Sequence, residues 1–463
     1  MRDVNEIEHI FRAYDIRGVV GQDLYPEIVT RIGAAFGTYI GKGTIAIAYD
    51  TRTSSIMFEQ AFTSGVLSTG VSVIKLGLLP IPALNFYLLS NTNLSGGVMI
   101  TASHNPPEYN GIRFRRTDGT GFTEENEKIK KIFYSTSKIT MANWYQLGTV
   151  YMEDITRLID RYVAFVSKKL KFSNENLRIV IDCGNGAAST FAPYVFRKLG
   201  LSIITVNCYP DGTFSSRPSD PLKGDLSVLK SAVLKYNASF GVAYDGDADR
   251  VVFIDEKGQL IPPEISGAIF AKYIISKGIG KTIVANVSCS MCVDDVVNGL
   301  GGTVVRSKVG DVFVAEKCKE TNAVLGVESS AHYFFPAYGL PYDDGIFGSL
   351  LMAEIISESE KALSELASEI PMYYTYTTNI DCPDRYKFEV VRQLIQRLSE
   401  QGEQILTLDG LKIITDSGWV LIRPSNTEPL IRVAIEGRDE QTVITLRNKY
   451  VRLLTEQIKN ITH

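Results

Sequence analysis

The sequence predicts an α/β protein of several domains, on three observations. Its 463 residues exceed what a single hydrophobic core supports, because domains typically hold about 100–200 residues. Short apolar runs alternate with longer amphipathic segments, which is the pattern of strands and helices in largely parallel sheets. The layout recurs three times and then stops. We therefore predict four domains: three related α/β domains with mixed, mostly parallel sheets and a smaller C-terminal α+β domain.

Each repeat begins with a buried strand, a small or polar turn and the start of a helix. These segments are TIAIAYDTRTSS from Thr44, LRIVIDCGNGAAS from Leu177 and TIVANVSCS from Thr282. In each repeat a later apolar run ends in a polar loop: GVMITASHNP near residue 100, FGVAYDGDADR near 245 and VLGVESSAH near 328. We place the domains at residues 1–150, 151–257, 258–370 and 371–463.

In the last domain the predicted strands and helices follow in a different order. An amphipathic helix starts at Tyr386 (YKFEVVRQLIQRL), and short strands follow in LKIITDSGWVLIRPSNTEPLIRVAIEG. A final helix, TVITLRNKYVRLLTEQI, comes after them. Strands that follow one another in this way predict an antiparallel sheet with two helices.

Composition excludes several classes of partner. The formal net charge is −4, and no dense Lys/Arg run offers a footprint for nucleic acid. The start, MRDVNEIEHIFRA, lacks the apolar stretch of a signal peptide, and no apolar run approaches the ~20 residues that span a bilayer. We expect a cytoplasmic monomer or homodimer that acts on small molecules.

The six cysteines are too sparse for a disulfide framework and fit a reducing compartment. Cys289 and Cys292 match C-x-x-C, but no second pair follows at zinc-site spacing, so buried or helix-terminal thiols are favoured over redox chemistry. GKT at Gly280 resembles the end of a P-loop, but position 275 is Ile where the leading Gly belongs. No nucleotide site is expected from it.

The first polar loop, TASHNPPEYNG, follows the apolar run GGVMI. The strand should aim Ser103 out of the end of the sheet. Pro106 and Pro107 fix φ and remove two backbone donors, which stiffens the loop. A stiff loop that presents a hydroxyl predicts a positioned nucleophile, although the loop alone does not indicate what it attacks.

The second loop, DGDADR, places Asp245, Asp247 and Asp249 at alternate positions. Three carboxylates so close repel one another without a cation, and hard oxygen ligands favour Mg²⁺ or Ca²⁺. An EF-hand would also put Glu256 at its twelfth position, but Arg250 stands where that loop needs Gly, and the flanks resemble strands. A solvated acidic turn is the remaining alternative to the Mg²⁺ site that we predict.

Two further loops suit a sugar phosphate. In RPSNTEPLIR, Arg423 and Arg432 offer planar forks for phosphate, with polar donors from Ser425, Asn426 and Thr427. An ordinary polar turn is the alternative there.

The loop GVESSAH alternates Glu328, Ser330 and His332, which would share one face of an extended chain. A carboxylate, a hydroxyl and an imidazole on one side suit the hydroxyls of a sugar. His332 could equally be a hydrogen-bonded structural histidine.

Together these loops resemble one family, the α-D-phosphohexomutases, and most of all its phosphomannomutase/phosphoglucomutase branch. The likeness spans the chain in the family's order: FRAYDIRG at Phe11 to Gly18, TASHNPPEYNG, DGDADR, ESSAH and RPSNTEP. The resemblance implies four domains around a central cleft. It also implies reversible phosphoryl transfer between the 1- and 6-positions of a mannose or glucose phosphate.

In the mechanism that the resemblance implies, Ser103 carries a phosphoryl group. Asp245, Asp247 and Asp249, with a phosphate oxygen on Ser103, hold one Mg²⁺ that neutralises charge on the transferring group. A hexose 1,6-bisphosphate forms, turns over and returns its other phosphate to the serine; it also serves as the activator.

The resemblance assigns further roles. His104 sits beside the nucleophile, and Arg250 lies near the reacting phosphate. The implied substrate contacts are Tyr14, Lys308, Glu328, Ser330, His332, Arg423, Ser425, Asn426, Thr427 and Arg432. An ordinary surface lysine is the alternative for Lys308.

The chain departs from the family pattern at two places. The family's YNG-x-K lysine, a general acid/base, is Arg113 here, and a guanidinium is a poor proton shuttle, so Arg17 or His104 becomes a candidate. The sugar loop is commonly GEMSGH, whereas Val327 and Ala331 stand here where the family favours glycines.

Three rival functions follow. A phosphoglucosamine mutase usually shows Gln between the Glu and Ser of the sugar loop, where this chain has Ser329. A Mg²⁺-dependent sugar-phosphate phosphatase would release inorganic phosphate. A non-catalytic sugar-phosphate-binding regulator would have no reason to keep Ser103, the three aspartates and the Arg423 loop together.

Overall fold

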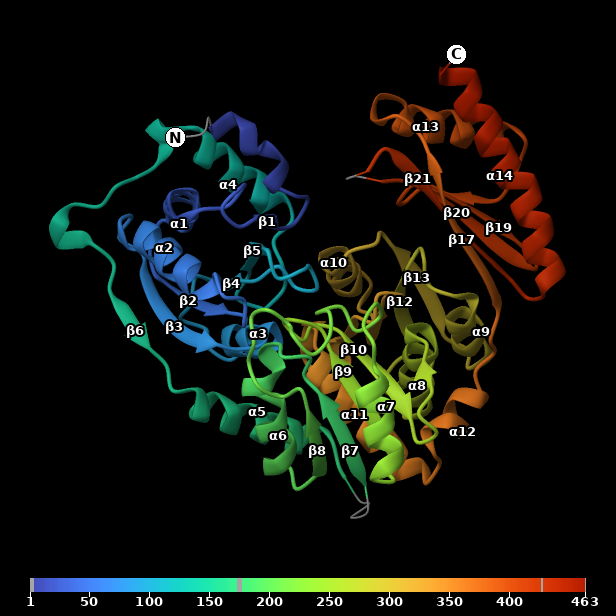
Figure 1. Cartoon of the computed structure of the whole chain (residues 1–463), viewed down its shortest axis with the longest axis horizontal. Coiled ribbons are helices and arrows are strands. Elements are labelled where there is room, and N and C mark those ends of the chain that lie inside the picture. Colours follow the sequence, from blue (N-terminus) through green and yellow to red (C-terminus); the bar gives the residue numbers. More distant parts are fainter. Residues whose placement is uncertain (1–3, 173–176, 426–427, 463) are drawn as a thin grey trace. The chain divides into compact units, whose positions relative to one another are not determined.

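The computed structural model describes residues 4–172, 177–425 and 428–462. Contacts divide the chain into two compact units (Figure 1). Unit 1 comprises Met1–Pro262 and Ala331–Leu366, and unit 2 comprises Pro263–Ser330 and Ala367–His463. Their sheets confirm the predicted fold class, with mixed sheets first and a C-terminal antiparallel sheet.

The first sheet of unit 1 has six strands in the order β1-β5-β4-β2-β3-β6. Strands β2, β3, β4 and β6 pair in parallel, while β5 runs antiparallel to β4 and β1. Helices α1 and α2 pack together, and α2 lies on β2 and β3 (Figure 1). The elements are η1 (Val4–Ile10), β1 (Ile16–Val19), α1 (Pro26–Ile40), β2 (Thr44–Tyr49), α2 (Ser55–Leu67), β3 (Ser72–Leu78), α3 (Ile81–Leu89), β4 (Gly96–Ile100), β5 (Tyr109–Arg115), α4 (Glu124–Tyr134), η2 (Thr136–Lys138), η3 (Trp144–Gln146) and β6 (Val150–Met152).

The second sheet of unit 1 has the order β11-β10-β9-β7-β8. Strands β9 and β10 pair antiparallel and are buried throughout. They flank the aspartate loop, which confirms the predicted strands there and excludes the helices of an EF-hand. The elements are α5 (Ile155–Lys169), β7 (Arg178–Asp182), η4 (Ala187–Thr190), α6 (Ala192–Lys198), β8 (Ser202–Val206), α7 (Ser227–Lys235), β9 (Phe240–Tyr244), β10 (Val251–Asp255) and β11 (Leu260–Ile261).

Unit 1 also contains a returning segment of the chain. Strands β15 and β16 pair antiparallel and lead into the buried helix α11. Asp344 caps that helix, since its Oδ1 accepts a hydrogen bond from the Phe347 N–H at 2.8 Å. The elements are β15 (Tyr333–Phe335), η5 (Pro336–Tyr338), β16 (Leu340–Asp343) and α11 (Gly345–Ser359); α12 (Leu363–Ser368) crosses the boundary between the units.

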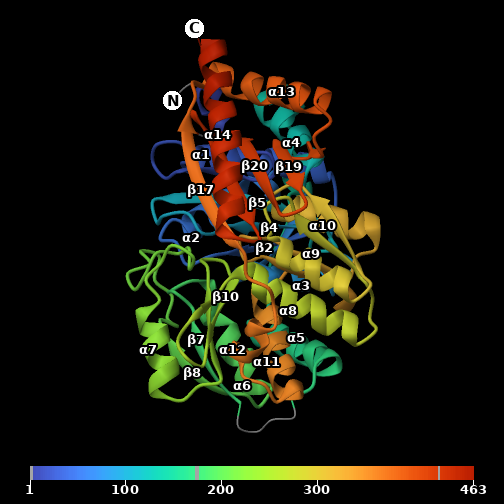
Figure 2. The same ribbon diagram turned by 90° about the vertical axis from the view of Figure 1, so that its right-hand side faces the viewer.

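Unit 2 begins with parallel strands in the order β13-β12-β14. It ends with the antiparallel sheet β17-β21-β20-β19-β18, against which α13 and the long α14 pack (Figure 2). The elements are α8 (Pro263–Ser276), β12 (Thr282–Asn286), α9 (Met291–Gly299), β13 (Thr303–Ser307), α10 (Asp311–Thr321), β14 (Leu325–Val327), β17 (Tyr374–Asp381), α13 (Asp384–Glu400), β18 (Ile405–Leu406), β19 (Leu411–Thr415), β20 (Gly418–Pro424), β21 (Leu430–Gly437) and α14 (Glu440–Thr462).

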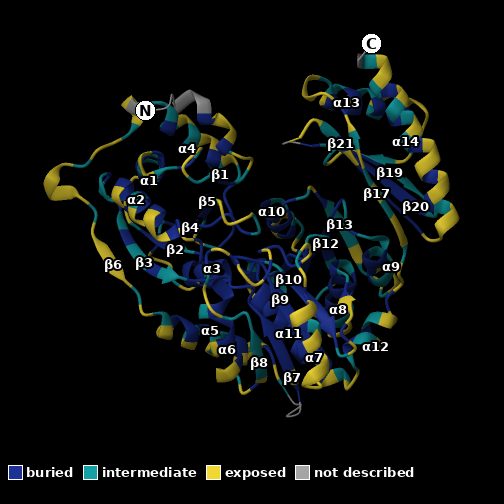
Figure 3. Ribbon diagram, viewed as in Figure 1, coloured by how far each residue is buried: buried dark blue, intermediate teal, exposed yellow. Residues whose placement is uncertain are grey.

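Burial follows the sheets, whose central strands are dark in Figure 3. Cys289 and Cys292 are free, buried thiols, as predicted. Among the described residues, no helix combines the length and apolar character needed to cross a membrane.

Candidate functional site

The serine loop leaves the sheet at the end of β4, all of whose residues are buried. Ser103 has φ +50°, a left-handed conformation that is uncommon for a residue with a Cβ. Its backbone N–H donates to Thr101 Oγ1 at 2.8 Å, and the residue is 2% exposed. The loop therefore fixes the direction of the serine hydroxyl.

Arg52 lies buried beneath this loop and binds its backbone. The guanidinium pairs with Asp50 at 3.1 Å and donates to four carbonyl groups. The acceptors are the carbonyl oxygens of Ser103, Asn105, Pro106 and Tyr109, at 2.5–2.9 Å. The loop's shape thus rests on a buried arginine as well as on its prolines.

The aspartate loop meets the serine loop within unit 1. Asp245, Asp247 and Asp249 are buried, and one carboxylate oxygen from each lies within 4.8 Å of the others. Ser103 Oγ donates to Asp245 Oδ2 at 3.2 Å, and Thr101 Oγ1 lies 3.2 Å from Asp247 Oδ2. The structure therefore brings together the nucleophile and the metal ligands expected from the sequence.

A close backbone approach makes this meeting possible. A Cβ placed on Gly246 would lie 2.5 Å from the carbonyl oxygen of Ser103. Only glycine allows the aspartate loop to pass so near the serine loop.

Electrostatics around the three aspartates favour a cation. Burial, followed by repulsion from Asp249 and Asp247, raises the pKa of Asp245 well above its usual value. Burial, followed by repulsion from Asp249, raises the pKa of Asp247 to about 6. Burial also opposes ionisation of Asp249, but His332 and Arg113 outweigh it and hold the pKa of Asp249 well below its usual value. A divalent ion would relieve the penalty on the first two.

Two oxygens of this cluster, Asp247 Oδ1 and Asp249 Oδ1, are buried without a hydrogen-bond partner among the residues that the structure describes. Asp249 Oδ1 lies 3.3 Å from His332 Nε2, so Asp247 Oδ1 is the oxygen left for a cation. Three carboxylates with an unsatisfied buried oxygen fit Mg²⁺, a hard cation that prefers oxygen ligands.

Arg113 occupies the position of the family's lysine. Its Nη1 lies 2.6 Å from Asp249 Oδ2 and 3.3 Å from Asp247 Oδ2. The guanidinium stays charged and neutralises the aspartate loop, so it is suited to binding rather than to moving a proton.

His104 is the titratable group beside the serine. Its Nδ1 lies 3.1 Å from Ser103 Oγ. Burial, and then the charges of Arg250 and Arg17, lower the pKa of His104, so its imidazole is neutral at physiological pH. Arg17 itself donates to Asn105 Oδ1 at 2.8 Å and thereby braces the serine loop.

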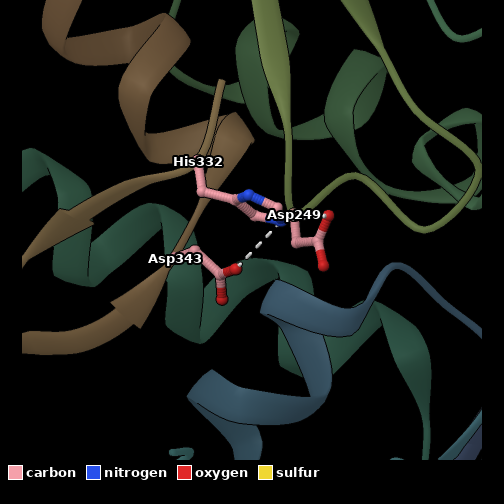
Figure 4. Close-up of side chains that lie close together, drawn as sticks. All are labelled: Asp249, His332 and Asp343. Atoms are coloured by element: carbon pink, nitrogen blue, oxygen red, sulfur yellow. Dashed lines mark ion pairs between the residues drawn. The ribbon is translucent and has the colours of Figure 1, made fainter. Parts of the chain in front are cut away.

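His332 extends the cluster (Figure 4). Its Nε2 lies 3.3 Å from Asp249 Oδ1, 3.5 Å from Asp343 Oδ2 and 3.3 Å from Arg250 Nε. The structure thus places His332, which the sequence assigned to the sugar, against the aspartate loop. Asp343, which the sequence did not indicate, joins it there. Tyr14, upstream of β1, is half-buried in the same unit.

In unit 2 the sugar loop is built around a buried carboxylate. Glu328 Oε1 accepts hydrogen bonds from Asn286 Nδ2 and from the Gly310 N–H, both at 2.8 Å. Ser330 Oγ lies 3.4 Å from Glu328 Oε2. Glu328 and Ser330 therefore lie in one polar site, without His332, which the sequence expected on the same face.

The arginine loop of unit 2 starts from β20. Arg423 Nη2 pairs with Asp409 Oδ2 at 2.8 Å, and the same oxygen accepts the Val309 N–H at 3.3 Å. Arg432 pairs with Glu428 at 2.8 Å and is exposed.

The other predicted residues of unit 2 contribute less to this geometry. Ser425 is buried, and its hydroxyl accepts the Glu428 N–H at 3.2 Å. Lys308 is exposed and lies 5.6 Å from the Phe313 ring. Asn426 and Thr427 lie outside the described residues.

Comparison with known proteins identifies the family of the chain. Models of the α/β/α domains I, II and III of phosphoglucomutase/phosphomannomutase match residues 8–140, 160–258 and 262–374, and the C-terminal domain model matches residues 378–453. The chain belongs to the phosphoglucomutase/phosphomannomutase family. It is therefore an enzyme of the phosphohexomutase superfamily.

Relatives of this phosphohexomutase carry two kinds of name. The probable phosphoglucosamine mutase of Methanopyrus kandleri is 39% identical over 97% of this chain and 99% of that protein. A phosphoglucomutase/phosphomannomutase of Thermococcus kodakarensis is 36% identical over 97% and 99%.

Solved structures share the fold. A Burkholderia thailandensis member of the phosphoglucomutase/phosphomannomutase family has a TM-score of 0.87 and 26% identity, covering 97% of each chain. A phosphomannomutase-like protein of Thermus thermophilus has a TM-score of 0.79 and 24% identity, covering 96% of this chain and 98% of its own.

Sequence reasoning missed the residues that support this site. Arg52, Asp50 and Thr101 hold the serine loop, and Asn286 holds Glu328. The sequence did carry a signal for Arg52 and Asn286. Arg52 lies just after the first strand of its repeat and Asn286 is the last residue of such a strand, and the repeat pattern predicts a polar turn at both places.

Proposed function

We propose that this phosphohexomutase interconverts glucosamine 6-phosphate and glucosamine 1-phosphate through a phosphoserine at Ser103 and a 1,6-bisphosphate intermediate. The reaction type rests above all on one observation. The Ser103 hydroxyl lies 3.2 Å from Asp245 within a buried cluster of three aspartates. A positioned hydroxyl and a site for a divalent cation are what phosphoryl transfer requires.

The residues of the aspartate loop would hold one Mg²⁺. When bound, the metal neutralises charge on the transferring phosphoryl group and makes it a better electrophile. Ser103 carries that group, and Arg52 keeps the loop in the conformation that aims it. Arg250 and Arg17 supply further positive charge for the phosphate.

We assign proton transfer to His104. The assignment rests on distance, because His104 Nδ1 lies 3.1 Å from Ser103 Oγ and is within hydrogen-bond reach of the serine proton. Arg113 remains protonated and keeps to its ion pairs with Asp247 and Asp249.

Unit 2 supplies recognition in this proposal. Glu328 and Ser330 bind the sugar, and the buried Glu328 carboxylate would complement the ammonium group of a 2-amino sugar. Arg423, Ser425 and Arg432 bind the phosphate that is not being transferred. For Asn426, Thr427, Lys308 and Tyr14 the substrate role stays a prediction.

The choice of hexose departs from the sequence expectation. Ser329 favoured mannose or glucose phosphate, but relatives of 35–39% identity are named probable phosphoglucosamine mutase. Ser329 Oγ hydrogen-bonds to Ser288 Oγ at 2.9 Å, so its hydroxyl is engaged within unit 2. The Thermococcus relative named phosphoglucomutase/phosphomannomutase keeps glucose or mannose phosphate as the second candidate.

Phosphorus NMR would test the proposal. Glucosamine 1-phosphate, glucose 1-phosphate and mannose 1-phosphate are supplied in separate tubes with Mg²⁺ and a trace of the matching 1,6-bisphosphate. We expect conversion to the 6-phosphate without inorganic phosphate, fastest for glucosamine. Faster turnover of glucose or mannose would overturn the substrate assignment. Growth of inorganic phosphate would indicate a phosphatase, and no change in any tube would indicate a binding protein.

A further inference from the structure

Residues 139–152 (ITMANWYQLGTVYM) contain no charged side chain and expose most of their apolar ones. Figure 3 shows this stretch, here called the edge segment, as largely exposed around β6. Trp144 is 84% exposed and Met152 is 75% exposed. The exposed apolar residues are Met141, Trp144, Tyr145, Leu147, Val150, Tyr151 and Met152. Soluble monomers seldom expose apolar patches larger than a few hundred Å² unless a partner covers them.

The backbone of the edge segment is also open. Strand β6 is the last strand of its sheet and pairs only with β3 among the strands described. The Thr149 carbonyl accepts the Val73 N–H at 2.9 Å, and the Glu153 N–H donates to the Lys75 carbonyl at 3.1 Å. Since hydrogen-bonding direction alternates along a strand, the N–H and C=O groups of the even residues in β6 point to the open edge. No proline or charge guards this edge.

We propose that the edge segment is the interface of a homodimer in which β6 of each copy pairs antiparallel across a two-fold axis. Such an axis brings identical edges together and extends the sheet from one copy into the other. Val150 of each copy then exchanges hydrogen bonds with Met152 of the other, and the two Tyr151 residues face each other.

Three observations favour a second copy over another occupant. The absence of charge means that identical surfaces meet without like charges opposed. The open backbone edge requires a strand, which a second β6 supplies. Seven exposed apolar side chains, three of them aromatic groups that bury about 150–250 Å² each, offer on the order of 800 Å², which is what each partner of a stable complex buries.

Sedimentation or light scattering measures the assembly state directly. We expect a dimer for the natural chain and a monomer for Tyr151→Asp, which opposes two carboxylates at the axis. Met152→Pro should also give a monomer, because it removes a donor that points to the open edge and none that faces β3. The matched control is Tyr194→Asp on α6, since Tyr194 is 51% exposed and Tyr151 is 53% exposed. This variant should remain a dimer, and thermal melts should show all three variants folded.

Cross-linking tests the register. In the proposed pairing, the two residues at position 151 form a non-hydrogen-bonded pair with Cα atoms about 4.5 Å apart, within the range for a disulfide. Tyr151→Cys should therefore give a reducible covalent dimer under mild oxidation, whereas Tyr194→Cys and the natural chain should not.

Three results would overturn the proposal: a monomer in the micromolar range, a dimer that Tyr151→Asp leaves intact, or a monomer that instead binds phospholipid vesicles. None of these variants touches the serine–aspartate site, so phosphohexomutase turnover should persist in all of them.

Discussion

The serine–aspartate site of unit 1 and the recognition loops of unit 2 are built in different ways. Ser103 is 2% exposed, and Arg52 binds four carbonyl groups of its loop. The side chain of Arg423 remains 28% exposed and pairs with Asp409. Groups that make and break bonds are fixed before substrate arrives, because misplacement by 1 Å is costly there. The two arginines that we propose to bind the substrate phosphate, Arg423 and Arg432, are partly exposed, although Glu328 of unit 2 is as buried as Ser103.

The largest effect should come from the nucleophile. Ser103→Ala is expected to lower turnover by at least about 10³-fold, since no other group can carry the phosphoryl. The unfolding midpoint should change little, because alanine carries the same Cβ as serine and meets the same strain at φ +50°. Steady-state assay and thermal melting check this, with exposed Ser64→Ala on α2 as the control. Turnover near the natural rate would refute the phosphoserine.

Loss of a metal ligand comes next. Asp247→Asn is expected to lower turnover by more than about 100-fold, because loss of even an outer partner of a metal site typically costs 10–100-fold. Mg²⁺ should raise the melting temperature of the natural chain and not that of the variant. The exposed Asp416→Asn serves as the control. An unchanged Mg²⁺ response in Asp247→Asn would remove that residue from the metal site.

Arg52, which holds the serine loop, should affect the catalytic rate more than substrate binding. Arg52→Lys keeps the charge but loses the fork, so kcat should fall by about 10–100-fold while KM changes little. Separate measurement of kcat and KM distinguishes misplacement of Ser103 from weaker binding. A rise in KM as large as the fall in kcat would mean that Arg52 supports substrate binding rather than the position of Ser103.

A recognition residue should show the opposite split. Arg423→Lys is expected to raise KM by about tenfold with kcat nearly unchanged, because the substitution removes the planar fork from the group that we propose to bind the substrate phosphate. Arg432→Lys should have a smaller effect, since Arg432 is more exposed and already paired with Glu428. If Arg423→Lys lowered kcat and left KM unchanged, unit 2 would contribute to the catalytic rate and not only to substrate binding.

The smallest predicted effect concerns stability. Lys412 on β19 is buried, donates to the Val287 carbonyl at 2.7 Å and lies 4.2 Å from the Trp419 ring. Burial lowers the pKa of Lys412 to about 7. Because the unfolded chain protonates this lysine near 10.5, its contribution to stability is complete above that pH and is lost as pH falls toward 7.

Lys412→Met should remove this dependence. The variant should gain free energy of unfolding over the natural chain at pH 7, and the gain should shrink at pH 10. Urea denaturation at the two pH values measures the difference. A gain that grows toward pH 10 would contradict the assigned pKa shift.

Much of the fold could be predicted because it depends on neighbours in sequence. Alternating apolar runs located β4, β9 and β10, and the changed rhythm after residue 370 located the antiparallel sheet. Residue types at local spacing predicted a positioned hydroxyl at Ser103 and a cation site in the aspartate loop, and the family resemblance implied the phosphoryl chemistry.

The supporting contacts could not be predicted in this way. Arg52 reaches a carbonyl 51 positions away, and Thr101 approaches Asp247 across 146 positions. Such pairs depend on the order of strands within a sheet and on which loops meet at its edge. The placement of His332 beside Asp249 and Asp343 is of the same kind.

By itself, then, the sequence determined the strands, the loop that presents Ser103 and the three neighbouring carboxylates, because local pattern and residue chemistry suffice for them. Only the tertiary structure decided how Ser103 is held, that the pKa of His104 is lowered, and that Arg113 pairs with the aspartate loop. The burial of a group and the electrostatic potential around it depend on residues distant in the chain. The pKa shifts and ion pairs of the site therefore exist only once the chain has folded.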